Sequence, residues 1–125
     1  MMRLWILLGG INAFLAVALG AFGAHSLKAR LVQTGQTEVY QTGAHYHLIH
    51  ALALLLIAIL AERWRSPLVE WSGWLLFAGI VLFSGSLYAL AISGVRPLGA
   101  ITPLGGLCFL AGWALLVVAA LKEPH

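Results

Sequence analysis

Four apolar runs, each long enough to cross a membrane, constrain this chain more than any other feature of its sequence. They cover residues 4–24, 43–61, 71–92 and 101–121. A helix needs about 20 predominantly apolar residues to cross the hydrocarbon core of a bilayer. Charged residues make up only 9% of the chain, against roughly 25% in a typical soluble domain. The sequence therefore predicts a single all-α membrane domain, residues 1–125, folded as a four-helix antiparallel transmembrane bundle.

The links between these runs leave no room for a soluble domain. Residues 25–43 form the longest link, in which Leu27 and Leu31 are four residues apart. This spacing predicts a short interfacial helix after the first span. The links at 62–70 and 93–100 are tighter.

An even number of spans places both termini on the same side of the membrane. Cytoplasmic loops carry an excess of Lys and Arg. Arg3 stands beside the first span, and Arg63 and Arg65 lie in the tight second link. With Lys122 these make four cations on the terminal side, against Lys28, Arg30 and Arg96 on the other. The count favours cytoplasmic termini.

Polar side chains within the spans gather in the half of the membrane away from the termini. The terminal half holds little besides Asn12 and Ser72. Hydrogen-bonding and ionisable residues at membrane depth are costly and raise a functional hypothesis by default. The asymmetry predicts a one-sided polar pocket that binds a small ligand, a lipid headgroup or a metal. Its candidate binding residues are His25, His47, His50, Ser84, Ser86, Tyr88 and Thr102.

Helical phase indicates which of these residues can act together. His47 and His50 are three residues apart and share a helix face, whereas His45 lies about 200° from His47 and is assigned to the loop or headgroups. His47, His50 and His25 are therefore the candidate ligands for a transition metal or a haem iron, which imidazole suits. No Cys, Met or carboxylate cluster completes such a site, so the cofactor stays unknown.

Two other interpretations remain open. The His, Tyr and Ser side chains can simply hydrogen-bond one another across helices and hold the bundle together, in a structural or assembly role. Alternatively, an oligomer forms a small transporter or channel, with copies or a partner protein supplying polar groups that one chain lacks. Catalysis is not expected, because the spans contain no Asp or Glu and the chain has no GxSxG or HExxH motif. No cluster of Lys and Arg indicates nucleic acid.

Four segments in order resemble a known family. They are Gly20-Ala-Phe-Gly-Ala-His25, Tyr46-His-Leu-Ile-His-Ala-Leu-Ala-Leu54, Leu82-Phe-Ser-Gly-Ser-Leu-Tyr88, and Ile101-Thr-Pro-Leu-Gly-Gly106 with Ala111-Gly-Trp113. The chain resembles the YgdD/YwdK family of bacterial inner-membrane proteins (domain of unknown function 423), which is similar to eukaryotic transmembrane protein 256. The resemblance implies a small multi-helix protein of the bacterial inner (plasma) membrane. It brings no catalytic residue, ligand or cofactor.

Overall fold

The computed structural model of the chain describes residues 2–122, and these residues are almost entirely helical. Four helical stretches are long and apolar enough to span a membrane. They are α1 (Met2–Ala24), α3 (Thr37–Trp64), the stretch α4–η1–α5 (Pro67–Gly79, Ile80–Ser84 and Gly85–Ser93), and η2 with α6 (Arg96–Ala100 and Thr102–Lys122).

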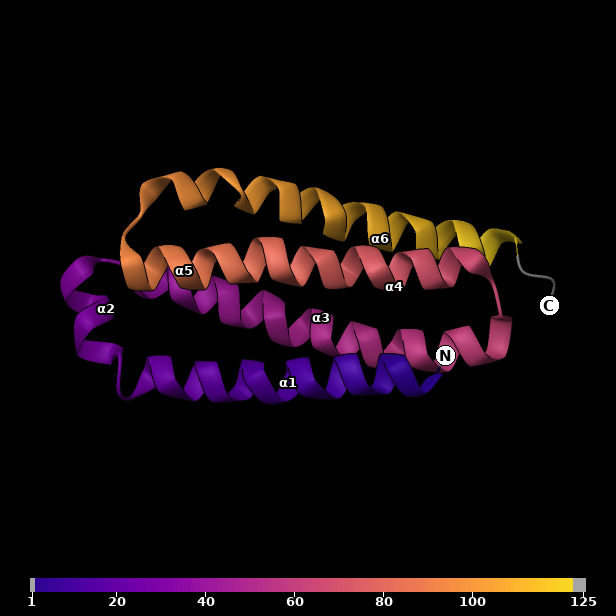
Figure 1. Cartoon of the computed structure of the whole chain (residues 1–125), viewed down its shortest axis with the longest axis horizontal. Helices are drawn as coiled ribbons and strands as arrows, with labels where there is room; N and C mark the ends of the chain where they lie inside the picture. Colours follow the sequence, from indigo (N-terminus) through magenta and orange to yellow (C-terminus); the bar gives the residue numbers. More distant parts are fainter. Residues whose placement is uncertain (1, 123–125) are drawn as a thin grey trace.

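The four stretches alternate in direction and lie side by side, with α1 and α6 on the outside and α3 and α4–α5 between them (Figure 1). α1 begins and α6 ends at the same end of the bundle, which we call the terminal end. The opposite, distal end carries α2 and the turn between α5 and α6. The predicted fold, an antiparallel four-helix bundle of membrane-spanning helices, is confirmed.

The predicted short helix after the first span is α2, Lys28–Thr34. Leu31 is buried and Leu27 half-buried, so one face of α2 packs on the distal end of the bundle. Arg30 Nη2 donates a hydrogen bond of 2.7 Å to the carbonyl of Ile92, near the end of α5. α2 ends at Gly35, whose φ of 69° is left-handed and suits a residue without Cβ. α2 is thus tied to the bundle by apolar packing and by one charge-assisted bond.

The second span is longer than its apolar run. α3 begins at Thr37 and continues to Trp64, so the histidine-rich segment 45–50 is regular helix rather than loop. This places His45 on the helix, where its side chain is exposed. Helical phase therefore controls which neighbour each of His47 and His50 meets.

The third span contains a π-helical turn, η1, between α4 and α5. One extra residue in a turn rotates everything that follows it around the helix axis, and such turns are frequent at functional sites. Gly105 of α6 lies directly against the backbone of η1, because a Cβ at this position would collide with the nitrogen and Cα of Phe83. Close helix contact at this glycine thus coincides with the irregular turn.

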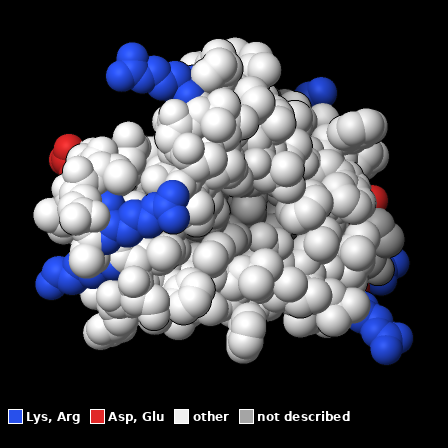
Figure 2. Space-filling model, turned by 60° about the vertical axis from the view of Figure 1, so that its left-hand side comes forward, with Lys and Arg blue, Asp and Glu red and all other residues white. Residues whose placement is uncertain are grey.

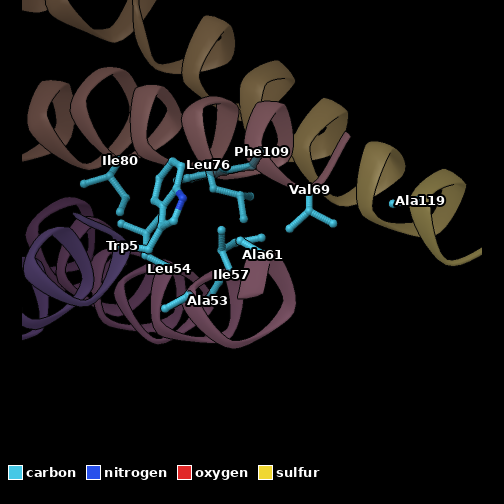
Figure 3. Close-up of a cluster of buried hydrophobic side chains, with 11 residues drawn as sticks. Trp5, Ala53, Leu54, Ile57, Ala61, Val69, Leu76, Ile80, Phe109 and Ala119 are labelled. Carbon is cyan, nitrogen blue, oxygen red and sulfur yellow. The ribbon is translucent and has the colours of Figure 1, made fainter. Parts of the chain in front are cut away.

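The main apolar core fills the centre of the bundle and extends toward the terminal end (Figure 3). Trp5 of α1 is fully buried and points among Ile57 of α3 and Leu76 of α4. Gly73 makes room for its ring, since a Cβ there would lie 2.6 Å from Trp5 Cη2. Ser72, whose hydroxyl donates to the carbonyl of Gly112 at 2.6 Å, is a buried polar residue beside this core.

Candidate functional site

Three helices are joined by a buried hydrogen-bonded group formed by Asn12, His47 and Tyr88. Asn12 Oδ1 and His47 Nε2 are 2.9 Å apart, and His47 Nδ1 and the Tyr88 hydroxyl are also 2.9 Å apart. Asn12 Nδ2 donates to the carbonyl of Leu8 at 2.8 Å, so its Oδ1 faces the imidazole as an acceptor. His47 therefore donates from Nε2, and as a neutral ring it accepts from Tyr88 at Nδ1.

Tyr40 extends this group toward the distal end. Its hydroxyl donates to the carbonyl of Leu19 on α1 at 2.5 Å, and its ring packs against Tyr88 with centroids 5.3 Å apart. Gly23 lies under the Tyr40 ring, where a Cβ would overlap the ring carbons. The group therefore crosslinks α1, α3 and α5 and leaves none of its imidazole nitrogens free.

His50 bonds a different helix. Its Nε2 accepts a 3.1 Å hydrogen bond from Trp113 Nε1 of α6. Because an indole can only donate, the proton of the imidazole must be on Nδ1, which donates to the carbonyl of Tyr46 at 2.8 Å. The His50 ring also stacks on Phe109 with centroids 3.6 Å apart. His50 is thus held as a neutral ring between α3 and α6.

A groove of about 570 Å³ lies beside this ring stack. It runs between α3, η1 and α6. Nearly all of its wall is apolar or aromatic, and no charged side chain lines it. A Cβ at Gly106 would have no atom closer than 4.0 Å, so this glycine adds space to the groove. The lining residues are Tyr46, His50, Phe83, Pro103, Gly106, Leu107, Phe109, Leu110 and Trp113.

Two of the predicted hydroxyl residues, Ser86 and Thr102, form a third group at the start of α6. Ser86 Oγ and Thr102 Oγ1 are 2.5 Å apart, and Ser86 donates to the carbonyl of Phe83 at 2.9 Å. Ser84 is buried, and its hydroxyl has no hydrogen-bond partner among the described residues. These contacts tie the start of α6 to η1 and α5.

The structure does not bring the three candidate metal ligands together. His25 is exposed in the turn after α1, while His47 and His50 turn toward different helices. Both ring nitrogens of each buried histidine are hydrogen-bonded, and a metal ligand needs a free nitrogen. Within residues 2–122, no three His, Cys, Asp or Glu side chains form a group that could hold a metal. The candidate residues therefore divide into separate sets rather than one polar pocket.

The candidate residues predicted from the sequence leave out several members of these sets, among them Asn12, Trp113, Tyr40 and Tyr46. Asn12 was assigned to the apolar half, yet it lies near the middle of α1 and meets His47. A lone amide inside an otherwise apolar run was the available signal. Trp113 belongs to one of the family-like segments, and a tryptophan in the middle of a span, away from the aromatic belts, needs a partner for its N–H.

Comparison with known proteins agrees with the membrane fold. A family model described as "Protein of unknown function (DUF423)" matches residues 19–106. The chain is 52% identical to UPF0382 membrane protein YwdK of Bacillus subtilis (strain 168), over 97% of this chain and 98% of that protein. It is 49% identical to UPF0382 membrane protein SERP0230 of Staphylococcus epidermidis, over 97% and 98% of the two chains. No solved structure matches the chain.

Proposed function

The chain belongs to the DUF423 family of membrane proteins, and from this premise we propose that it binds a lipid-soluble molecule in the groove between α3 and α6. The observation that carries the proposal is the groove itself. Its volume of about 570 Å³ lies in the range of small-molecule sites, which are roughly 300–1,000 Å³, mostly apolar and provided with few polar groups.

The surroundings of the groove favour an occupant that arrives from the bilayer. Leu107 and Leu110 on its rim are 62% and 68% exposed, and both lie within a membrane-spanning helix. Figure 2 shows a mostly uncharged surface, with Lys and Arg side chains at a few projecting points. A charged molecule would have no counter-charge in the groove and would lose its hydration there. A neutral, lipid-soluble molecule can enter the groove from the bilayer and needs no counter-charge there.

The Asn12–His47–Tyr88 group supports a different role, that of a structural crosslink. Asn12 and His47 are buried, both imidazole nitrogens are paired within the protein, and none of the three residues lines the groove. A ligand could bind His47 only by breaking one of these hydrogen bonds. We therefore separate the two histidines, His50 beside the binding groove and His47 in the crosslink.

Gly106→Leu tests the proposal by filling the groove. Because position 106 is open, the larger side chain enters space rather than a packed core. Gly10→Leu is the matched control, since Gly10 is exposed on α1 and a Cβ there meets nothing within 4 Å. The proteins are expressed in bacteria, purified in mild detergent and analysed by native mass spectrometry for retained small molecules.

We expect a retained hydrophobic molecule in the wild type and in Gly10→Leu, and its loss in Gly106→Leu. Circular dichroism should show the same helix content in all three proteins. A molecule retained equally by Gly106→Leu would overturn the groove as the binding site. A wild-type protein that carries no molecule, and that takes none up from added membrane-lipid extract, would overturn the proposed function.

We also propose the bacterial inner (plasma) membrane as the location, with both termini in the cytoplasm. Arg3, Arg63, Arg65 and Lys122 at the terminal end support this orientation. A binding role without catalysis agrees with the groove, whose lining contains no carboxylate, thiol or amine. In this orientation, the groove lies in the outer half of the membrane, because Pro103 near its edge is one residue into α6 at the distal end.

A further inference from the structure

We propose that the molecule bound in this groove carries a flat, neutral ring with a carbonyl oxygen, as a quinone head group does, and that the Tyr46 hydroxyl donates a hydrogen bond to that oxygen. The inference rests on the proposed function and names the class of its ligand. An acyl chain alone is the competing occupant, which the experiment below separates from the ring.

The ring planes beside the groove point to a flat ligand. Tyr46 and His50 are parallel within 7°, His50 and Phe109 within 11°, and Tyr46 and Phe109 within 16°. The Tyr46 ring lies 6.0 Å from His50 and 6.2 Å from Phe109, so it stands beside that stacked pair rather than on top of it. Phe83 and Trp113, which also line the groove, are tilted by 44° to 58° against these rings. A planar molecule in the groove can therefore stack in one orientation against the three parallel rings.

The hydrogen-bonding groups of the groove limit the polar part of the ligand. His50 uses both ring nitrogens, and Trp113 uses its only N–H on His50. Tyr46 is 39% exposed. Its ring packs beside His50 and Phe109, and its backbone carbonyl accepts a hydrogen bond from His50. Its hydroxyl is therefore the group that the groove can offer to a ligand. A groove with one hydrogen-bond donor and no charged side chain suits a ligand with a carbonyl oxygen on an otherwise apolar ring.

The shape of the groove leaves a path for a hydrocarbon tail. Along α6 it extends from Pro103 to Trp113, which at about 1.5 Å per residue is roughly 15 Å. Exposed Leu107 and Leu110 form the side that faces lipid. A ring held near Tyr46 and Phe109 would thus leave its tail in the bilayer.

The test uses decyl-benzoquinone as the probe, with dodecylbenzene as a ring compound that lacks a carbonyl. Quinones quench tryptophan fluorescence, and Trp113 lines the groove. We expect saturable quenching in the wild type and in Gly10→Leu, and at least a tenfold weaker affinity in Gly106→Leu. Leu110→Phe, which narrows the groove from its exposed rim without adding a tryptophan, should weaken it in the same direction if Gly106→Leu folds poorly.

Tyr46→Phe isolates the hydroxyl, because the ring and the backbone bond to His50 stay. Loss of one ligand hydrogen bond predicts an affinity about 3- to 10-fold lower. Unchanged affinity in Tyr46→Phe would overturn the hydrogen bond, and displacement of the quinone by equal amounts of dodecylbenzene would overturn the carbonyl requirement. If the wild type shows no saturable quenching yet retains a lipid that Gly106→Leu loses, the ring inference fails and the proposed function stands. If neither molecule binds, both fail.

Discussion

Two histidines three residues apart on α3 bond different helices, and Nε2 is a donor in one of them and an acceptor in the other. His47 donates from Nε2 to Asn12 of α1, whereas His50 donates from Nδ1 to its own helix and accepts from Trp113 of α6. The two imidazoles therefore carry their protons on different nitrogens. A buried polar group in an apolar medium must be paired, and each neighbouring helix supplies the pairing. α3 is consequently joined to α1 on one side and to α6 on the other by side-chain hydrogen bonds.

Tyr88→Phe should destabilise the protein, because it removes the partner of His47 Nδ1. Hydrogen bonds between membrane helices average about 0.6 kcal/mol, while an unpaired buried acceptor costs about 1–3 kcal/mol. We expect a loss of about 0.5–2 kcal/mol, measured by reversible unfolding of ligand-free protein in mixed micelles. Tyr46→Phe is the control, and its stability should be near that of the wild type. Equal losses in both variants would contradict the crosslink.

The hydrogen-bond partners of His47 and His50 could not be predicted from residue types alone. The sequence indicated that His47 and Tyr88 belong to a polar half of the bundle, and the structure brings these two together. It also indicated one shared face for His47 and His50. Their side chains nevertheless differ by about 60° in direction around the helix, which is enough for them to contact different neighbouring helices. Asn12 completes the group because of the depth at which α1 packs on α3, and pattern analysis of α1 alone cannot supply that depth.

At the scale of elements, the π-helical turn η1 fixes how α6 packs on the third span. Gly105 touches the backbone of Phe83, while its neighbour Gly106 opens into the groove. Two adjacent glycines therefore have different physical reasons for lacking a side chain. The first allows close helix contact, and the second adds space to the groove.

Gly105→Ala should lower stability, and Gly106→Ala should not. A methyl group at position 105 would meet backbone atoms, which cannot move aside as a flexible side chain can. Overpacking of this kind costs about 1–3 kcal/mol, whereas alanine favours helix over glycine by up to about 1 kcal/mol. Thermal unfolding in detergent, followed by circular dichroism, compares the two variants. Melting temperatures that fall equally would show that α6 does not depend on close contact at Gly105.

Sequence patterns predicted the elements better than their irregularities. Apolar runs located four spans, and the leucine spacing in residues 25–43 predicted α2. The π-helical turn at Ile80–Ser84 was not predicted, because an inserted residue leaves the hydrophobic character of a span unchanged. It nevertheless rotates α5 relative to α4. This rotation affects which neighbouring residues Ser84, Ser86 and Tyr88 contact. The polar residues predicted to form one pocket therefore lie in separate groups.

At the scale of the whole molecule, the orientation in the membrane decides which leaflet borders the groove. The groove begins near the distal end of α6. Lys28 and Arg30 of α2 lie at this end, and Arg96 of η2 joins them. The terminal end carries the short link between α3 and α4, where Arg63 and Arg65 lie. Lys and Arg in short loops retain those loops in the cytoplasm, which would place the groove in the outer leaflet.

Cysteine labelling tests this orientation with substitutions that leave every Lys and Arg in place and remove at most one acidic residue. In a Cys108→Ala background, Gln33→Cys introduces a thiol on the exposed face of α2, and Glu62→Cys introduces one at the end of α3. Acidic residues contribute little to orientation, so Glu62→Cys should keep the native topology. In intact cells, a membrane-impermeant maleimide should label Gln33→Cys, and it should label Glu62→Cys only after permeabilisation. The reverse pattern would place the groove in the inner leaflet, and labelling of both thiols in intact cells would contradict a bundle whose two ends face different compartments.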